Sequence, residues 1–475
     1  MKGSSAFSWL EGNDGRRGIS RSAASLGRRG LKIAPAPAAA IMLGLVSPAN
    51  AQVVPTTIEG VAPPWNAQQI FDPSTLPVLS DPGSGEPVPI EDTPVRYRQQ
   101  PGYETVGVRA GSWMFNPSLI TGGFYDSNVF SSNTLKRSDI AAVVEPSLRA
   151  RTLWEQHGID LTLSEQSTVY NANPGLNQTN ASLRGNAWFD VSQDMQVLTN
   201  FEIAHLNLGV GTLSSPTNAV QPTPYDLFSG DVTLRKEFNR LTTSIGFRTN
   251  SYDYGSTQAQ NGATINEDGL DGQIYALHGR IDYAFSPTLG WFSAVEGNQR
   301  DIRGTPGHPL DSEGYRALSG ITVSLTNLIS GEFGAGYVQQ RFVDPTIGTI
   351  DGPSYRAKLT WHPTRLLDVH FNAEQIVTET SESSSTGVLA NALQLGFDYE
   401  LRRNVIFSLS GGYEDDRFFG QLRKDHVITT DADIKYIFNR FGSVSLFHRY
   451  TARDSNIPIF SFEKNQVGIN VTAQF

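Results

Sequence analysis

The sequence predicts an all-β fold, a transmembrane up-and-down antiparallel β-barrel of about 18 strands. Apolar and polar residues alternate with a period of two from about residue 113 to the C-terminus, which gives each strand one apolar and one polar face. Short and long connections alternate along the same part of the chain. Aromatic residues recur at the short-connection ends of the strands, as in barrels of bacterial outer membranes.

The alternation is clearest in the last strand. Apolar residues occupy every second position there, and the residues between them are small or polar; the apolar ones are Val467, Ile469, Val471, Ala473 and Phe475. The pattern recurs along the chain and predicts strands near residues 112–122, 140–153, 157–170, 180–190, 195–208, 225–238, 241–254, 271–285, 288–300, 313–326, 330–343, 352–362, 366–379, 389–401, 404–416, 424–438, 441–453 and 461–475.

Every second connection between these strands is a short turn, for example at residues 154–156, 239–240, 286–288, 363–365 and 439–440. The alternate connections are long and polar, at residues 206–224, 255–270, 301–312 and 380–388. Outer-membrane barrels have short periplasmic turns and longer outside loops, so this order predicts that the N- and C-terminal ends of the barrel lie in the periplasm. A secreted β-sandwich or β-helix would not need such an order.

Seven aromatic residues fall at the short-turn ends of the predicted strands, where an interfacial girdle is expected. They are Phe189, Phe238, Phe285, Trp361, Tyr399, Phe438 and Phe475. The terminal Phe475, with Val471 and Ala473 on the same face of its strand, also resembles the signal that the outer-membrane barrel-assembly machinery reads. We therefore expect outer-membrane lipid and this machinery as partners.

Two segments precede the predicted barrel. Residues 1–51 hold seven basic and two acidic residues, followed by a short apolar run and an Ala-x-Ala pattern at Ala49 and Ala51. This order predicts a secretory signal peptide that is cleaved after Ala51. Residues 52–105 are rich in proline and predict an extended periplasmic linker, which assigns residues 106–475 to the barrel.

Composition excludes several classes of protein. The 475 residues include no cysteine, which excludes disulfide scaffolds, cysteine nucleophiles and thiolate metal sites. The formal net charge of −10 argues against nucleic acid as a partner, because phosphate binding depends on clustered basic residues. The mean hydropathy of −0.28 is typical of a soluble protein. Half of each barrel strand faces water, however, so this average does not exclude a membrane barrel.

The polar faces of the strands are expected to line the interior, which in barrels of sixteen to eighteen strands is typically an aqueous channel. Basic and acidic residues nearly balance there, which predicts a mixed wall rather than strong charge selectivity. The pore-lining candidates are Arg149, Arg151, Arg184, Arg235, Arg248, Arg280, Arg356, Lys358, Asp368, Glu374, Asp398, Asp431, Asp433, Lys435 and Arg449, with Glu145, Glu202, Asp231, Asp282 and Glu400 as further acidic positions. Each has a simpler alternative role, hydrating the interior or pairing with a neighbouring strand.

The sequence contains none of the common catalytic motifs, neither G-x-S-x-G, nor H-E-x-x-H, nor a phosphate-binding glycine-rich loop. His362 and His370 fall on adjacent predicted strands with Asp368 and Glu374. A metal or acid–base cluster is one interpretation of these four residues, and ordinary polar residues of a wet face are the other. We expect no enzyme activity, no metal and no cofactor.

The start of the barrel region carries a family resemblance. Residues 100–112 read QPGYETVGVRAGS, residues 115–119 read FNPSL and residues 124–130 read FYDSNVF. These segments, together with residues 143–148 and 154–157, are similar to the second putative β-barrel porin family of Gram-negative outer membranes. Ser127 replaces the middle Asp of that family's Tyr-Asp-Asp-Asn-Val run. The resemblance covers roughly residues 100 to 475.

Asp126, Ser127 and Asn128 also have a physical interpretation, since these residue types bond their own backbone and favour a turn after the first strand. The functional alternative is a polar ligand for a cation or sugar at the outer mouth.

Members of the family are often encoded beside exopolysaccharide synthesis and export genes. The resemblance therefore implies an outer-membrane conduit for a secreted polymer, with the polysaccharide and its export machinery as partners. The alternatives are a general diffusion porin for small polar solutes and a structural or binding barrel that does not conduct. The sequence leaves the oligomeric state open.

Overall fold

Antiparallel strands make up most of the structure, a computed structural model that describes residues 95, 100 and 102–475, except for 213–214, 217, 305–308, 326–327, 346–347 and 379–386. The expected signal peptide, with Ala49 and Ala51, and most of the expected linker at residues 52–105 lie outside the described residues. Within the described part of the chain, no helix is long and apolar enough to cross a membrane.

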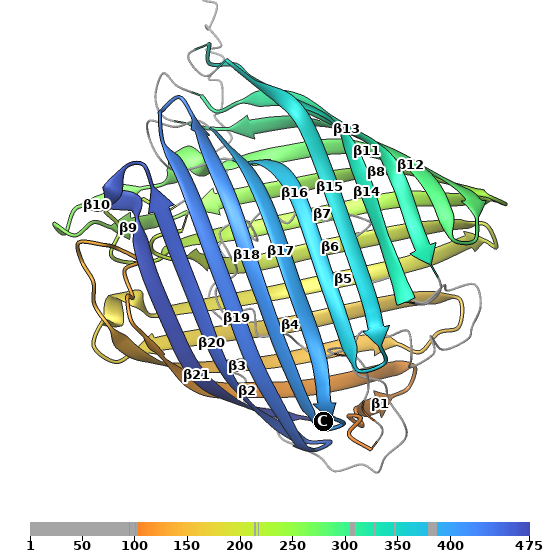
Figure 1. Ribbon diagram of the computed structural model, residues 1–475, viewed down its shortest axis with the longest axis horizontal. Coiled ribbons are helices and arrows are strands. Elements are labelled where there is room, and N and C mark those ends of the chain that lie inside the picture. Colours follow the sequence, from red (N-terminus) through yellow and green to blue (C-terminus); the bar gives the residue numbers. More distant parts are fainter. Residues whose placement is uncertain are drawn as a thin grey trace, which may run out of the picture. The chain divides into compact units, whose positions relative to one another are not determined.

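Eighteen long strands form the barrel wall (Figure 1). The first half comprises β2 (Trp113–Asp126), β3 (Asp139–Thr152), β4 (His157–Tyr170), β5 (Gln178–Ser192), β6 (Met195–Leu208), β7 (Thr223–Phe238), β8 (Leu241–Tyr254), β11 (Gly272–Ser286) and β12 (Leu289–Ile302). The second half comprises β13 (Ser312–Leu325), β14 (Ile329–Phe342), β15 (Thr349–Thr364), β16 (Leu367–Thr378), β17 (Gly387–Arg402), β18 (Val405–Phe419), β19 (Lys424–Asn439), β20 (Gly442–Ser455) and β21 (Phe462–Gln474).

The remaining elements are short. β1 (Val108–Ala110) forms a small hairpin with the start of β2, and β9 (Ser256–Gln258) pairs with β10 (Thr264–Asn266) in the connection between β8 and β11. The 3-10 turns η3 (Pro174–Leu176), η4 (Asp268–Leu270) and η6 (Pro458–Phe460) lie in longer connections.

Each long strand pairs antiparallel with the next, and the last pairs with the first. β2 and β21 meet in a register that runs from Ser118 opposite Gln474 to Asp126 opposite Gln466. This seam closes the barrel, so no wall strand is left with an open edge to satisfy inside a membrane. The predicted fold class and strand number are confirmed.

The strands hold 12 to 16 residues, whereas a tilted transmembrane strand needs about 9–11. The wall is therefore long enough to span a bilayer and to project beyond it. The connections alternate in length as predicted. Two-residue turns at 193–194, 239–240 and 440–441 define what we call the turn end of the barrel, and longer connections such as 127–138, 209–222 and 255–271 define the loop end.

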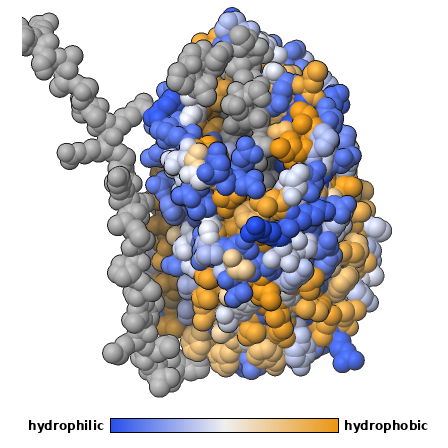
Figure 2. All heavy atoms as spheres, turned by 90° about the vertical axis from the view of Figure 1, so that its left-hand side faces the viewer, coloured by the Kyte–Doolittle hydropathy of each residue, from blue (hydrophilic) through white to orange (hydrophobic). Residues whose placement is uncertain are grey.

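The outward face of the wall is apolar. Side chains such as Ile245, Leu277 and Ile469 on this face are more than half exposed. Figure 2 shows hydrophobic residues gathered over a wide area of the surface, beside a region rich in hydrophilic residues. All seven aromatic residues of the predicted girdle are exposed near the turn end, and the ring of Phe475 stacks on that of Phe441 with centroids 5.7 Å apart.

Candidate functional site

The inner wall of the barrel is the candidate site, because charged side chains concentrate there. Thirteen of the fifteen pore-lining candidates occupy positions that alternate along their strands with exposed apolar residues, whereas Asp368 and Glu374 on β16 alternate with apolar residues that are half-buried or buried. On β8, for example, Phe247 is 49% exposed and its neighbour Arg248 is 3% exposed. The period-two pattern therefore positions the candidates, and contacts among them explain why several are buried.

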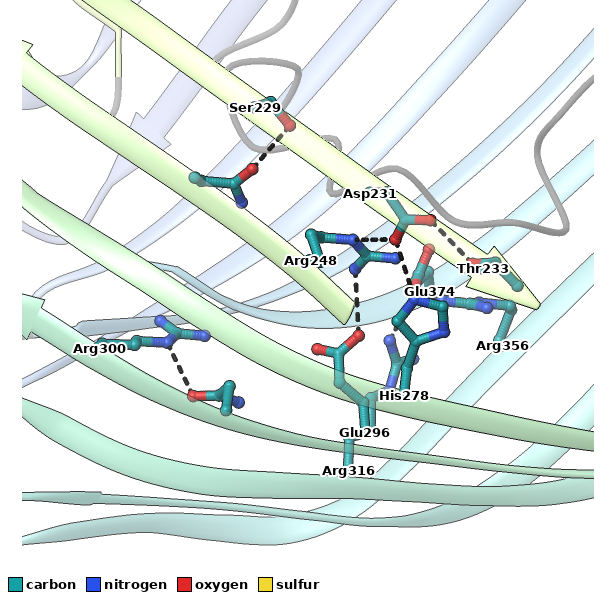
Figure 3. Close-up of polar contacts among 12 residues, drawn as sticks. Ser229, Asp231, Thr233, Arg248, His278, Glu296, Arg300, Arg316, Arg356 and Glu374 are labelled. Carbon is teal, nitrogen blue, oxygen red and sulfur yellow. Dashed lines mark hydrogen bonds and ion pairs between the residues drawn. The ribbon is translucent and has the colours of Figure 1, made fainter. Parts of the chain in front are cut away.

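Asp231 on β7 is the centre of a buried ionic cluster (Figure 3). Its carboxylate accepts a hydrogen bond from Thr233 Oγ1 at 2.8 Å and lies 2.9 Å from His278 Nε2 and 3.3 Å from Arg248 Nε. Arg248 also donates to Glu296 on β12, two strands away, at 3.1 Å. Four consecutive strands are thereby connected through one guanidinium group and one carboxylate.

Ion pairs across several strands continue around the wall (Figure 3). Arg280 on β11 donates to Glu332 on β14 at 3.0 Å. Arg316 on β13 and Arg356 on β15 both donate to Glu374 Oε1 on β16, each at 2.7 Å. Because each charge faces an opposite charge in a partly enclosed interior, the network holds its side chains in fixed positions.

The other candidates also have polar surroundings. Arg149 Nε donates to Asp160 at 2.9 Å, Arg184 Nε to Glu202 at 2.9 Å, Arg449 Nε to Asp431 at 2.6 Å and Arg235 to Glu237 at 2.5 Å. The remaining ones also lie on inner-face positions: Arg151 is two residues after Arg149 on β3, Lys358 is opposite Glu332 in the β14–β15 register, and Asp433 and Lys435 come after Asp431 on β19.

At the turn end, residues that precede the barrel contact its inner wall. The backbone N–H of Val95 donates to Asp368, and Gln100 Nε2 donates to Glu400 Oε2 at 3.1 Å. Val95 also packs against Ile406 and Ile437, two apolar residues on inner-face positions of β18 and β19. The chain before β1 therefore enters the turn end of the interior at these two described residues.

The two histidines that suggested a metal or acid–base cluster contact different carboxylates. His362 Nδ1 lies 2.5 Å from Asp368, and His370 Nε2 lies 3.3 Å from Asp398. Glu374 is bound to Arg316 and Arg356 instead. Among the residues that the structure describes, no group of three His, Asp or Glu side chains is arranged to hold a metal.

Asp126, Ser127 and Asn128 form the predicted turn. The backbone N–H of Asn128 donates to Asp126 Oδ1 at 2.8 Å, and Ser127 exchanges two hydrogen bonds with Asn465, at 2.9 and 2.8 Å. Asp126 also accepts from Gln466 and lies 2.9 Å from Lys464 Nζ. These side chains therefore join β2 to β21 at the loop end of the closing seam.

A second buried charged cluster lies at the loop end of β18, β19 and β20. The guanidinium of Arg423 lies between the rings of Phe418 and Phe460, 4.1 and 3.5 Å from their centroids, and donates to Asp425. Arg453 lies 3.8 Å from the same carboxylate. The buried acids Glu414 and Asp416 occupy neighbouring inner-face positions on β18.

Several of these residues were not among the predicted candidates, although the strand pattern contains a signal for two of them. Arg316 alternates with Tyr315 and Ala317 on a predicted strand, and Arg453 has the same strand parity as Arg449. Both could have been assigned to the inner face. Arg423 precedes its strand and is brought inward only by its contacts with Phe418 and Phe460, which no periodicity predicts.

Comparison with known proteins gives one family match. The model of the family described as “Putative beta-barrel porin 2” matches residues 100–475. No curated protein matches the chain.

The chain is also similar, at low sequence identity, to several solved structures. OccK5 (OpdH) of Pseudomonas aeruginosa is 14% identical, with a TM-score of 0.39 over 76% of this chain and 98% of that one. OpdK of the same organism, solved with vanillate, is 10% identical, with a TM-score of 0.40 over 76% and 99%. The siderophore receptor PirA of Acinetobacter baumannii is 7% identical, with a TM-score of 0.43 over 76% and 80%.

Proposed function

Since the chain belongs to the family described as Putative beta-barrel porin 2 and is a porin-like channel of the outer membrane, we propose that it admits small polar solutes by diffusion. The proposal is carried by the ionic network on the inner wall. Ion pairs such as Arg248–Glu296, Arg280–Glu332 and Arg316–Glu374 keep polar groups directed inward across several strands. A wall of this kind favours a hydrated path for polar solutes, with nearly balanced charge.

The loop end supports small solutes over a polymer. The connections 127–138 and 209–222 contact each other there, at Ser131 and Gly211. The approach is so close that a Cβ built on Gly211 would lie 2.3 Å from the Cβ of Ser131. Two non-adjacent connections in contact narrow the opening that an 18-stranded wall would otherwise leave. In this proposal the loop end faces outside, the turn end faces the periplasm, and the N- and C-terminal ends of the barrel therefore lie in the periplasm.

Export of a polysaccharide is our second proposal, and it follows from the sequence resemblance. It is favoured by the half-buried row of hydroxyl and carboxyl groups on β18 and β19, formed by Ser408, Ser410, Asp431 and Asp433, which suits a hydrated sugar chain. Passage of a polymer would require the touching connections at the loop end to separate. The two proposals therefore differ in the size of solute that crosses the closed barrel.

Liposome swelling tests the proposal directly. We expect liposomes that contain the purified protein to swell in a pentose and in a disaccharide at decreasing rates, and not to swell in dextran. Empty liposomes are the control. No swelling in any solute would contradict a channel.

A deletion strain that loses secreted polysaccharide while its uptake of small solutes is unchanged would favour export.

A further inference from the structure

A cavity of about 70 Å³ lies at the loop end of the barrel. It is lined by described residues of the connections 127–138 and 209–222, by Gln260, by Arg423 and Arg453, and by Ile459 and Phe460 before β21. The volume has room for several water molecules or for a small organic molecule. Segments far apart in the sequence thus enclose one polar space at the mouth.

The charge of the lining is of one sign. Among the described residues that line the cavity, the two charged ones are Arg423 and Arg453. The buried acids Asp416 and Asp425, which balance the arginines, are not part of the lining. An anion that enters therefore meets guanidinium groups and neutral polar groups, with the carboxylates behind them.

Two buried polar atoms of the lining have no hydrogen-bond partner among the described residues, Nε of Arg453 and Oγ of Ser215. The side chain of Arg453 is 5% exposed, and its Nε lies 3.8 Å from the nearest Asp425 oxygen, which is too long for a hydrogen bond. A buried donor without an acceptor is costly, and a ligand oxygen would satisfy it. Arg453 and Ser215 belong to different segments of the chain, β20 and the 209–222 connection.

Arg423 is held in place before any ligand arrives. Its guanidinium lies between Phe418 and Phe460, and its Nε donates to Asp425 at 3.1 Å. A planar guanidinium fixed between two rings presents a rigid cationic surface. It would attract an anion, but as a donor it cannot accept a hydrogen bond from Arg453 Nε.

We propose that this cavity binds the carboxylate of a small organic anion. One carboxylate oxygen accepts from Arg453 Nε and the other from Ser215 Oγ, which matches two free donors to two oxygens. The inference deepens the proposed function by naming a class of solute, and its part in solute passage rests on that function; the binding itself does not.

The test measures binding of lactate to the detergent-solubilised full-length protein by ligand-observed saturation-transfer NMR. We expect lactate to bind and lactamide, its uncharged analogue, to bind far more weakly. Arg453→Gln should weaken lactate binding about tenfold or more, because it removes a charge-assisted hydrogen bond. Arg417→Gln is the matched control: it removes the same charge at the same end of the barrel, from a side chain that is 59% exposed and does not line the cavity.

A second variant keeps the test decisive if Arg453→Gln does not fold. Ser215→Ala removes one proposed donor from a connection and should also weaken lactate binding. The proposal is overturned if lactate does not bind the unchanged protein, if lactamide binds equally well, or if Ser215→Ala and a folded Arg453→Gln bind like Arg417→Gln. Inorganic phosphate that binds more tightly than lactate would overturn the carboxylate assignment.

Conductance of the same preparations separates this site from the proposed function. Lactate binding by a barrel that carries no current would support the site and contradict the channel. Current without lactate binding would support the channel and contradict the site.

Discussion

The guanidinium of Arg248 shows what single residues contribute to this wall. It is 3% exposed, and it connects Asp231 on β7 to Glu296 on β12. Arg235, by contrast, pairs with Glu237 near the turn end with both side chains at least 40% exposed. The two arginines face the same interior. Breaking the buried pair is nevertheless expected to lower the free energy of unfolding far more than breaking the exposed pair.

Arg248→Met is expected to lower the free energy of unfolding by about 3 kcal/mol, because it leaves buried Asp231 and its neighbour Glu296 without their cation. Urea unfolding in detergent micelles measures the change. Arg235→Met is the control and should cost at most about 1 kcal/mol, since its pair is exposed. Equal losses in the two variants would show that the buried network does not stabilise the barrel.

Periodicity assigned the candidate residues to the inner face, but it could not predict their partners. Arg248, Arg280 and Arg316 each bind a carboxylate two or three strands away. Such pairs depend on the curvature and twist of the closed wall, which bring together residues that no strand register places opposite each other. The sequence predicts that these charges are inside, and only the fold shows which pairs they form.

At the scale of elements, two connections of the loop end contact each other. Gly211 has a φ of +79° and lies against Ser131 of another connection. Gly262 has the same φ of +79° in the connection between β9 and β10, and nothing lies within 4 Å of a Cβ built on it. The two glycines therefore share the same φ, which would strain any substituted residue, and differ in what lies beside them.

Gly211→Val should force the 127–138 and 209–222 connections apart and raise single-channel conductance, because its side chain needs the space of Ser131. Gly262→Val is the matched control for backbone strain. We expect its conductance to equal that of the unchanged protein. A conductance of Gly211→Val no higher than that of the control would show that these connections do not limit the opening.

The last strand combines a structural and a proposed assembly role. The backbone N–H of Phe475 donates to Pro117 O at 3.0 Å across the seam, and this hydrogen bond does not need the aromatic ring. We therefore expect Phe475→Ala to reduce the amount of folded barrel in cells while refolding from urea into lipid vesicles stays unchanged. Heat-modified mobility on electrophoresis measures both.

Phe438→Ala is the control, since Phe438 is 47% exposed in the same girdle but lies within the chain. Equal folded amounts of the two variants in cells would contradict an assembly signal at the terminal residue. A refolding defect confined to Phe475→Ala would assign the ring to stability instead.

The whole molecule is organised by two faces. Leu277 near the middle of β11 is 59% exposed on the outward face, whereas Leu422 is 89% exposed in the β18–β19 connection. Leu277→Arg should lower the free energy of unfolding in lipid vesicles by about 2–4 kcal/mol, because it places a charge in the hydrocarbon. Leu422→Arg should change it by less than about 0.5 kcal/mol. Equal effects would contradict a lipid-facing surface at Leu277.

Much of the architecture was predictable because one face of every strand must be apolar and the other polar. That rule predicted the strand number and the inner face, and the aromatic residues at the short-turn ends of the strands predicted the girdle. It could not give the contact of Val95 with Asp368, the meeting of Gly211 and Ser131, or the cavity beside Arg453. These depend on how connections and the preceding chain pack against the wall, and such packing has no sequence period.

The single-channel current of the purified barrel in a planar lipid bilayer, with potassium chloride on both sides, tests most directly whether the protein conducts. We expect discrete steps of current that are proportional to voltage, with little preference for cation or anion, because the sequence predicts a nearly balanced charge on the inner wall. A bilayer that contains the folded protein and carries no current would contradict this expectation.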